Sequence, residues 1–440
     1  MIPNPEKKVS EDLNIYDLDD SFLIKIILSL GKNESSIGGM PINFIFSRLL
    51  RSIEINPVSL IRRIRRRRKF TLKNTILIYE KIFELFLLIY QRTGDIRYLN
   101  CLLKLDDCHW KNFGYFNAIV HFFWRKSPEM IHYLGLIKSH LIDLEASNKI
   151  FTINISPNFL TDTEVNEFVK NISFDEYSGG VVVFCPNIRS LYTLCVCELL
   201  RLSGVKISAV IVKRVFNYSR IVDEVSRDGV YWVFKKFFQR YLFRGFSESV
   251  VAARSLAHLS RLLKIDHLDV DSWARISEVS VIHTNDFNSI EHQNFLKNLS
   301  VKLGVFTGGG LIRRNILEVF GLGIINCHGG ILPAYRGLDV EKWAILENNP
   351  NALGCCAHLM SVGVDEGDIL VQYITKLEKQ SSLDRIGYNL EYPQCILLCH
   401  AVLGLLGGQI IPLNQNKDDG RQFFYMHKSI SHILKRRLAI

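Results

Sequence analysis

Three polar side chains in the last third of the chain have types and spacing that suit chemistry. Asn326 and His328 end an apolar run, GIINCH, and Asp365 lies further on in the run SVGVDEGDIL. Because strand side chains alternate between faces, Asn326 and His328 would point to the same side. Amide, imidazole and carboxylate groups can donate, relay and accept protons. The pattern therefore favours a site for proton transfer at a strand end.

The residues around this trio support a ligand site. Ligands of an open parallel sheet bind at the carboxyl ends of its strands. A turn rich in glycine and proline follows His328, as a loop that shapes a substrate site would; it contains Gly329, Gly330, Pro333 and Gly337. Taken singly, a histidine at a strand end or an aspartate before a glycine is more often structural. The prediction therefore depends on the combination and its spacing.

The combination resembles the folate-dependent formyltransferase family. That family's pattern is Asn-x-His, then Leu-Pro, then an aromatic residue with Arg-Gly, then Asp-x-Gly. The matching residues here are Asn326 and His328; Leu332 and Pro333; Tyr335, Arg336 and Gly337; and Asp365, Glu366 and Gly367. The continuous resemblance covers residues 300–375, and a weaker match in strand order extends back to residue 180.

The resemblance implies both the reaction and the roles of its residues. An amine would attack the formyl carbon of 10-formyltetrahydrofolate, and charge would develop on the formyl oxygen. Asn326 would donate to that oxyanion, His328 would donate and relay a proton, and Asp365 would orient His328 or accept the amine proton. The folate contacts would come from Gly308, Gly309, Gly310, Leu311, Ile312, Ile331, Leu332 and Pro333. No set of His, Cys and carboxylate residues has metal-ligand spacing, so no metal is expected.

Some residues depart from the family's pattern. Gly329 and Gly330 stand where some members have a small residue followed by Ser. Glu366 occupies a position that is usually small or hydroxylated, and a carboxylate there is expected to raise the pKa of Asp365. Familiar members also begin with the catalytic domain, whereas a long segment precedes it here.

The flanking sequence predicts the elements that position these residues. Apolar runs at residues 181–185, 206–214, 279–284, 302–307 and 323–328 predict strands, and residues 190–203, 288–299 and 311–320 predict helices between them. Such βαβ units form a mostly parallel sheet covered by helices. The first strand-to-helix turn, CPNIRS, contains no glycine, which disfavours a dinucleotide site. The predicted class is α/β, a Rossmann-like formyltransferase domain with an all-α domain in front.

The N-terminal region differs in pattern. Apolar residues recur at helical spacing in residues 22–30, 44–53, 76–90 and 130–144, and residues 95–107 predict another helix. We therefore predict a helical domain of unknown role in residues 1–175, a catalytic domain in residues 178–375 and a short C-terminal helical extension in residues 376–440. That extension would hold a short strand, an apolar helix at residues 396–406 and a basic tail.

Composition limits the class of protein. The chain has 440 residues, 48% hydrophobic and 22% charged, a globular balance. Its ten cysteines form no CxxC pair, which indicates reduced thiols in a cytoplasmic protein. Residues 74–91 and 396–413 are apolar but interrupted by polar groups, so buried helices are expected rather than transmembrane segments.

Positive charge is concentrated locally within a net charge of +10. The cluster at residues 62–69 is either a solvated face or a contact for nucleic acid, an anionic membrane surface or a nucleotide-linked substrate. Residues 225–244 form a basic amphipathic stretch, expected as a surface helix over the core, with a lipid or partner site as the alternative.

The amine acceptor follows from comparing groups within the family. Members that act on a ribose phosphate carry a glycine-rich first turn, members that act on methionyl-tRNA carry a β-barrel after the catalytic domain, and members that hydrolyse the donor carry a small α/β domain in front. None of these fits the flanking sequence. A nucleotide-linked amino sugar for surface polysaccharide is the expected acceptor, in a possible homodimer. The alternatives are formylation of methionyl-tRNA and a non-catalytic binding or scaffold protein.

Overall fold

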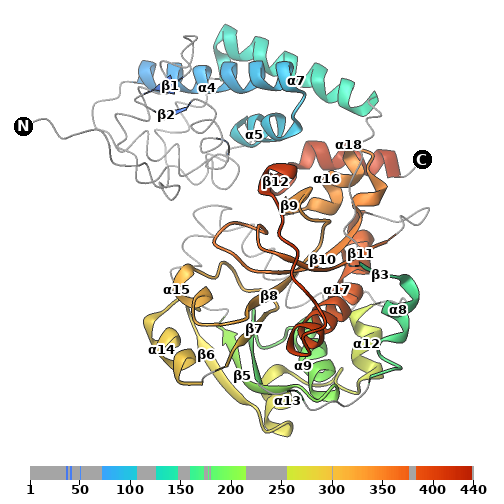
Figure 1. The fold of residues 1–440 in the computed structure, drawn as a ribbon. Helices are drawn as coiled ribbons and strands as arrows, with labels where there is room; N and C mark the ends of the chain where they lie inside the picture. The colour runs from blue at the N-terminus through green and yellow to red at the C-terminus, as the bar shows by residue number, and fades with distance from the viewer. Residues whose placement is uncertain are drawn as a thin grey trace, which may run out of the picture. The chain divides into compact units, whose positions relative to one another are not determined.

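The computed structural model describes residues 36–37, 40–41, 50, 72–106, 125–146, 159–172, 177, 180–214, 255–299, 301–375 and 383–438 (Figure 1). The chain divides into two compact units. One comprises Met1–Ser147, Val222–Arg240 and Tyr425–His432, and the other comprises Asn148–Ile221, Tyr241–Phe424 and Ile433–Ile440. The predictions for residues 22–30, 62–69 and 225–244, and for residues 44–53 apart from Leu50, lie outside the described residues.

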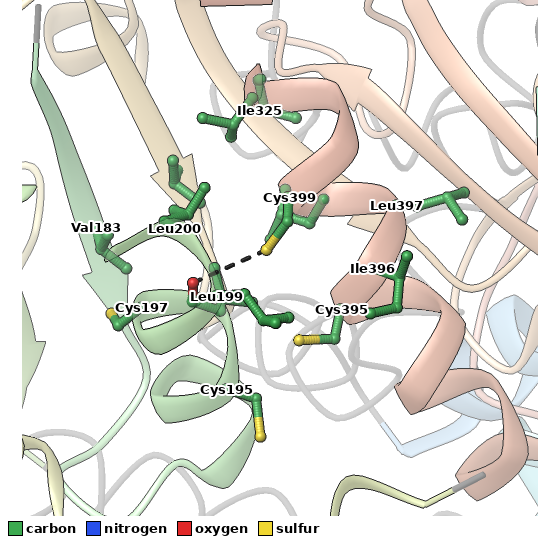
Figure 2. Packing of buried hydrophobic residues seen from close by; sticks show 14 of the residues in the cluster. Val183, Cys195, Cys197, Leu199, Leu200, Ile325, Cys395, Ile396, Leu397 and Cys399 are labelled. Carbon is green, nitrogen blue, oxygen red and sulfur yellow. Dashed lines mark hydrogen bonds between the residues drawn. The ribbon is translucent and has the colours of Figure 1, made fainter. Parts of the chain in front are cut away.

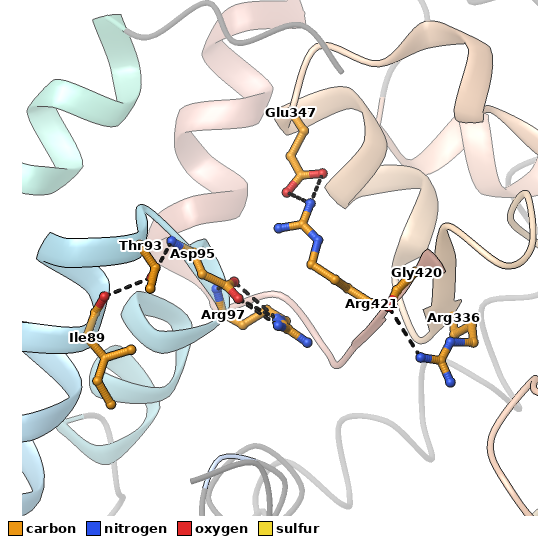
Figure 3. A network of polar contacts seen from close by, with 8 residues as sticks. All are labelled: Ile89, Thr93, Asp95, Arg97, Arg336, Glu347, Gly420 and Arg421. Atoms are coloured by element: carbon orange, nitrogen blue, oxygen red, sulfur yellow. Dashed lines mark hydrogen bonds and ion pairs between the residues drawn. The ribbon is translucent and has the colours of Figure 1, made fainter. Parts of the chain in front are cut away.

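The first unit is helical where it is described, apart from the two-residue strands β1 (Ser36–Ile37) and β2 (Met40–Pro41). Its helices are α4 (Leu72–Thr93), α5 (Ile96–Asp106) and α7 (Pro128–Ala146). Helix α4 packs against both α5 and α7, and the Phe86 ring meets Tyr98 edge-on at 5.5 Å. The helices predicted at residues 76–90, 95–107 and 130–144 are confirmed. A short turn joins α4 to α5, where the Asp95 N–H donates to Thr93 Oγ1 and Asp95 accepts from Arg97 (Figure 3).

The second unit is built on an eight-stranded sheet in the order β3-β11-β10-β8-β7-β4-β5-β6. Every neighbouring pair is parallel except the two that involve β10. The bounds are β3 (Phe159–Leu160), β4 (Gly180–Cys185), β5 (Lys206–Lys213), β6 (Ser280–Thr284), β7 (Leu303–Phe306), β8 (Gly323–His328), β10 (Gly354–Leu359) and β11 (Ile369–Ile374). Continuous apolar runs such as β4 suit strands buried on both faces. The predicted mostly parallel sheet is confirmed.

Helices cover both faces of the sheet. One face packs against α9 (Leu191–Leu202), α12 (Leu256–Leu262), α13 (Val270–Ile276) and α17 (Leu383–Leu406), which share a core with Val183 and Ile325 (Figure 2). The Cys399 thiol of α17 donates to the Val196 carbonyl of α9 at 3.8 Å. On the other face, α14 (Ile290–Leu299) and α15 (Arg314–Leu317) pack around Phe184, Phe287 and Ile316. The second unit is therefore a three-layer α/β structure.

Two predicted helices have different bounds in the structure. The apolar helix expected at residues 396–406 is the last part of α17, which begins at Leu383 and contains Pro393. The helix expected at residues 311–320 is reduced to the four residues of α15. The remaining elements are α8 (Asp162–Glu167), β9 (Tyr335–Gly337), α16 (Val340–Leu346), η3 (Pro350–Ala352), η4 (Lys417–Asp419), β12 (Arg421–Phe423) and α18 (Lys428–Leu438). Among the described residues, no helix has the length and apolar character needed to cross a membrane.

Candidate active site

Strand β8 carries Asn326 and His328 at its carboxyl end. Strand β10 runs antiparallel beside it and places His358 opposite Asn326. The Nδ1 atom of His358 lies 2.8 Å from the Leu359 carbonyl oxygen, to which only a ring N–H can donate. Its Nε2 atom lies 3.2 Å from Asn326 Nδ2. This contact uses at most one of the two Asn326 amide hydrogens, so at least one remains for another acceptor.

The carboxylate of Asp365 meets both histidines. Its Oδ2 lies 3.4 Å from His328 Nδ1, and its Oδ1 lies 3.5 Å from His358 Nε2. The backbone N–H of Gly337 donates to Oδ2 at 2.9 Å. Asn326, His328 and Asp365, grouped by their pattern in the sequence, thus lie in one cluster, and His358 belongs to it as well.

The backbone of Asp365 adopts an unusual conformation. Its φ is 54°, in the left-handed region that side chains other than glycine's seldom occupy. Such a conformation costs roughly 1 kcal/mol and persists only where the surroundings enforce it. The Gln415 side chain donates from Nε2 to the Asp365 carbonyl oxygen at 3.0 Å and also to the Gly367 carbonyl. The loop that presents the carboxylate is therefore held from its backbone as well as its side chain.

The pKa of Asp365 is determined by opposing effects. Burial alone would raise the pKa of this carboxyl, since it disfavours the charged form. The facing His328 and His358 rings and the Gly337 N–H act in the other direction and hold the pKa of Asp365 well below its ordinary value. Asp365 is therefore a carboxylate throughout the neutral range and can stabilise a positive charge on a neighbouring group.

The neighbouring carboxylate, Glu366, does not have the effect that its position in the sequence suggests. We expected Glu366 to raise the pKa of Asp365, and that expectation is wrong. The Glu366 carboxylate is paired with the Arg336 guanidinium at 2.5 Å, which offsets its charge. Its side chain folds back over Gly363, where a Cβ atom would overlap it.

His328 uses both of its ring nitrogens. Its Nε2 lies 2.8 Å from the Tyr335 carbonyl oxygen, while its Nδ1 faces Asp365. The protonated ring can donate to both acceptors at once. Donation from His328 to a formyl oxygen would consequently use a nitrogen that now serves one of these partners, whereas Asn326 has an amide hydrogen to spare.

Tyr335 is itself fixed at its other end. Its hydroxyl donates to Glu347 at 2.6 Å, and the ring stacks on Phe423 with centroids 5.2 Å apart. Burial, followed by the nearby Glu347 charge, raises the pKa of the Tyr335 phenol, so the hydroxyl remains a donor. The carbonyl that receives the His328 hydrogen bond therefore belongs to an immobilised residue.

A glycine turn follows β7, the strand beside β8. Gly308, Gly309 and Gly310 have φ values of 121°, 115° and 115°. A Cβ atom on Gly309 would come within 2.6 Å of the Phe287 ring. Lys213, at the end of β5, donates from Nζ to the Gly309 carbonyl oxygen at 2.5 Å. The turn therefore lies at the carboxyl edge of the sheet in a backbone conformation that favours glycine, and at Gly309 there is no room for a side chain.

The other residues expected to contact folate lie in different environments. Leu311 is 72% exposed and can meet a ligand directly, whereas Ile312, Ile331 and Leu332 are buried and their side chains pack in the protein interior. Pro333 follows a cis peptide bond after Leu332. Ile312, Ile331 and Leu332 can therefore shape the loops that contain them, but a ligand would meet their backbone rather than their side chains.

Sequence reasoning missed His358, Gln415, Asn288 and Lys213. Asn288 accepts from the Arg313 N–H at 2.7 Å and donates to the Leu311 carbonyl at 3.0 Å, which ties down the segment after the glycine turn. His358 had one available signal, a polar residue within the apolar run GCCAHL. The part of the chain that the structure describes contains no group of His, Cys, Asp and Glu residues that could hold a metal ion.

Comparisons with known proteins bear on the segment that carries this cluster. Residues 279–402 match the family model described as formyl transferase. A methionyl-tRNA formyltransferase of Solibacter usitatus is 30% identical over 143 residues, covering 30% of this chain and 46% of that protein. One from Microcystis aeruginosa is 32% identical over 121 residues, covering 28% and 37%. The matches therefore span less than half the length of these curated relatives.

Solved structures that match this chain include formyltransferases. A sugar N-formyltransferase from Shewanella is 12% identical with a TM-score of 0.37, covering 59% of this chain and 87% of that one. Glycinamide ribonucleotide transformylase 1 from Symbiobacterium toebii is 17% identical with a TM-score of 0.36, covering 56% and 98%. The resemblance that the sequence predicts is confirmed by the family match, which covers residues 279–402 of this chain.

Proposed function

We propose that the protein is an N-formyltransferase that moves a formyl group from 10-formyltetrahydrofolate to a primary amine. The observation that carries the proposal is the contact of Asp365 with His328 beside Asn326, at a strand end within the family-matched segment. A scaffold protein would have no need to keep a buried carboxylate, an imidazole and an amide in mutual reach.

Asn326 is the proposed oxyanion donor. Its Nδ2 atom lies beside His358 Nε2, a contact that uses at most one of the two amide hydrogens. The second hydrogen is available for the formyl oxygen as negative charge develops there. A donor of this kind typically contributes about 10²–10³ in rate.

His328 and Asp365 form the proposed proton-transfer pair. The amine nitrogen attacks the formyl carbon, a C–N bond forms, and the bond from that carbon to the folate nitrogen breaks. One proton leaves the amine and one reaches the departing folate nitrogen. Asp365 holds the charge that His328 acquires during this exchange, and such a positioned acid–base pair contributes about 10²–10⁴ in rate.

The donor would bind along the glycine turn after β7. Backbone groups of Gly308, Gly309 and Gly310 are accessible to a flat ring because no side chain intervenes, and the exposed Leu311 adds apolar surface. Ile331, Leu332 and Pro333 would shape the other side of the donor site. Holding donor and amine together supplies a further large part of the rate.

For the acceptor we propose a nucleotide-linked amino sugar. The turn after β4, CPNIRS, contains no glycine, so its backbone is less open to the phosphate of a small ribose phosphate. The run of residues 328–345 also resembles family members that act on amino sugars. The alternative acceptor is methionyl-tRNA, which is favoured by the curated relatives matched above.

A consumption assay with 10-formyltetrahydrofolate separates these acceptors. The purified full chain would be incubated with 3- and 4-amino sugar nucleotides, with charged initiator tRNA and with water alone, and formylated products would be identified by mass spectrometry. Turnover with an amino sugar nucleotide supports the proposal. Turnover with tRNA alone, at a rate that falls steeply as the salt concentration rises, would identify tRNA rather than an amino sugar as the acceptor.

Other predictions stay proposals alongside this one. They are the division into residues 1–175, 178–375 and 376–440, a homodimeric state and a cytoplasmic location. The nine cysteines among the described residues are all free thiols, which suits a reducing compartment.

A further inference from the structure

Residues 415–423, here named the C-terminal brace, touch the candidate site from two sides. On the Asp365 side, the contact comes from Gln415, whose side chain is almost completely buried. Its Nε2 donates to the carbonyl oxygens of Asp365 and Gly367, the first at 3.0 Å. These bonds hold the strained backbone of Asp365 in place.

On the His328 side, the brace pairs with the loop that accepts the His328 hydrogen bond. Strand β12 runs parallel to β9, with Arg421 opposite Tyr335. The Arg421 N–H donates to the Ala334 carbonyl at 3.0 Å, and the Leu338 N–H donates to the Phe423 carbonyl at 3.0 Å. The main chain on both sides of Tyr335 is therefore tied to the brace.

Side chains reinforce this pairing. Arg421 donates to both oxygens of Glu347 at 2.6 and 2.8 Å (Figure 3). Glu347 also accepts from the Tyr335 hydroxyl at 2.6 Å. Arg336 also donates to the Gly420 carbonyl at 3.4 Å. Glu347 is buried, and the brace supplies the guanidinium that faces its carboxylate.

The backbones meet too closely for any side chain between them. A Cβ atom on Gly420 would overlap the Pro333 carbonyl, and one on Gly337 would overlap the Phe423 carbonyl. This close fit leaves little freedom for the brace to shift relative to the Tyr335 loop.

We propose that the C-terminal brace is a positioning element: it fixes the Asp365 carboxylate and the Tyr335 carbonyl, the two acceptors of His328, relative to each other. The inference rests on the proposed function for its consequence in rate, but not for the contacts themselves. The family match ends at residue 402, so the brace lies outside it. Gln415 and Arg421 act through Asp365 and Tyr335 and are positioning residues rather than catalytic ones.

The test compares Gln415→Leu with Asn416→Ala in the full chain. Asn416 is the neighbouring residue, and its described contacts stay within the 416–419 turn. Hydrogen exchange, followed by mass spectrometry on peptides covering residues 361–369, should speed up at least tenfold in Gln415→Leu and remain unchanged in Asn416→Ala. An unchanged exchange rate in Gln415→Leu would overturn the proposal that the brace holds the Asp365 loop.

Steady-state kinetics test the consequence. Gln415→Leu should lower kcat by about 10- to 100-fold with little change in the KM for the donor, because a small misplacement of reacting groups has effects of this size. Arg421→Gln should act in the same direction, and Arg421→Lys, which keeps the charge, should recover part of the loss. If a variant shows faster hydrogen exchange in residues 361–369 but an unchanged kcat, the brace does not position the reacting groups.

Failure of the proposed function gives a different result. If the wild-type chain formylates no acceptor, the exchange experiment still measures the brace, since it needs no substrate. If Gln415→Leu does not fold, Arg421→Gln and Arg421→Lys provide the same comparison from the Tyr335 side.

Discussion

Two neighbouring strands end in segments built on opposite principles. After β8 and in the loop before β11, the site consists of side chains: Asn326, His328 and Asp365 are joined by hydrogen bonds and charge. After β7, the site consists of backbone: Gly308–Gly310 adopt positive φ values, and Gly309 lies against the Phe287 ring. Proton transfer needs groups that titrate, whereas close approach of a flat ligand needs the absence of side chains. We call these segments the polar wall and the glycine wall.

A substitution in the polar wall should cause the largest loss of activity. Asp365→Asn keeps an acceptor for the Gly337 N–H but removes the charge that faces His328. We expect kcat to fall by about 10³-fold, the loss typical of a positioned acid–base group, with the donor KM nearly unchanged. Single-turnover measurements with saturating donor check this. A loss confined to KM would mean that Asp365 only binds substrate.

A substitution in the glycine wall should change the KM for the formyl donor rather than kcat. Gly309→Ala brings a Cβ atom to 2.6 Å from the Phe287 ring at a φ of 115°, so the turn must shift. We expect the donor KM to rise about tenfold, as 1–3 kcal/mol of strain would produce. Gly321→Ala is the control, because a Cβ atom there meets nothing within 4 Å. Equal effects of the two substitutions would argue against a donor site at the turn.

His358→Phe gives a smaller effect within the polar wall. It keeps a ring of similar size but loses the ring nitrogen that lies beside both Asn326 and Asp365. A single hydrogen bond contributes about 0.5–1.5 kcal/mol, so we expect a two- to tenfold loss in kcat. His358→Gln should restore part of the rate. A loss as large as that of Asp365→Asn would place His358 among the reacting groups.

The smallest expected effect is that of Asp365→Asn on the stability of the fold at acid pH. The folded-state pKa of Asp365 is depressed, so its contribution is present above its unfolded pKa of about 3.9 and is lost as the pH falls below that value. The free energy of unfolding in urea should therefore decline more steeply below about pH 4 in the wild type than in Asp365→Asn. Parallel curves would contradict the charge interactions described for Asp365.

Local sequence predicted much of this site, and its errors share a cause. Strand β8 was predicted with its observed bounds because apolar runs and strand periodicity are local properties. The meeting of His358 with Asn326 was missed because it depends on the antiparallel register of β10. The pKa effect expected of Glu366 was wrong because Arg336, thirty residues earlier in the chain, offsets its charge.

The sequence alone determined the α/β class, the positions of the main strands and the trio of Asn326, His328 and Asp365. These follow from hydrophobic periodicity and from a pattern of residue types, both legible along the chain. Only the tertiary structure decided which groups surround Asp365 and which nitrogen of His328 meets which acceptor. It also decided that residues 415–423 contact the backbone of Asp365 and pair with the strand that contains Tyr335. Those features arise from pairings between distant segments, whose register is fixed by packing rather than by local sequence.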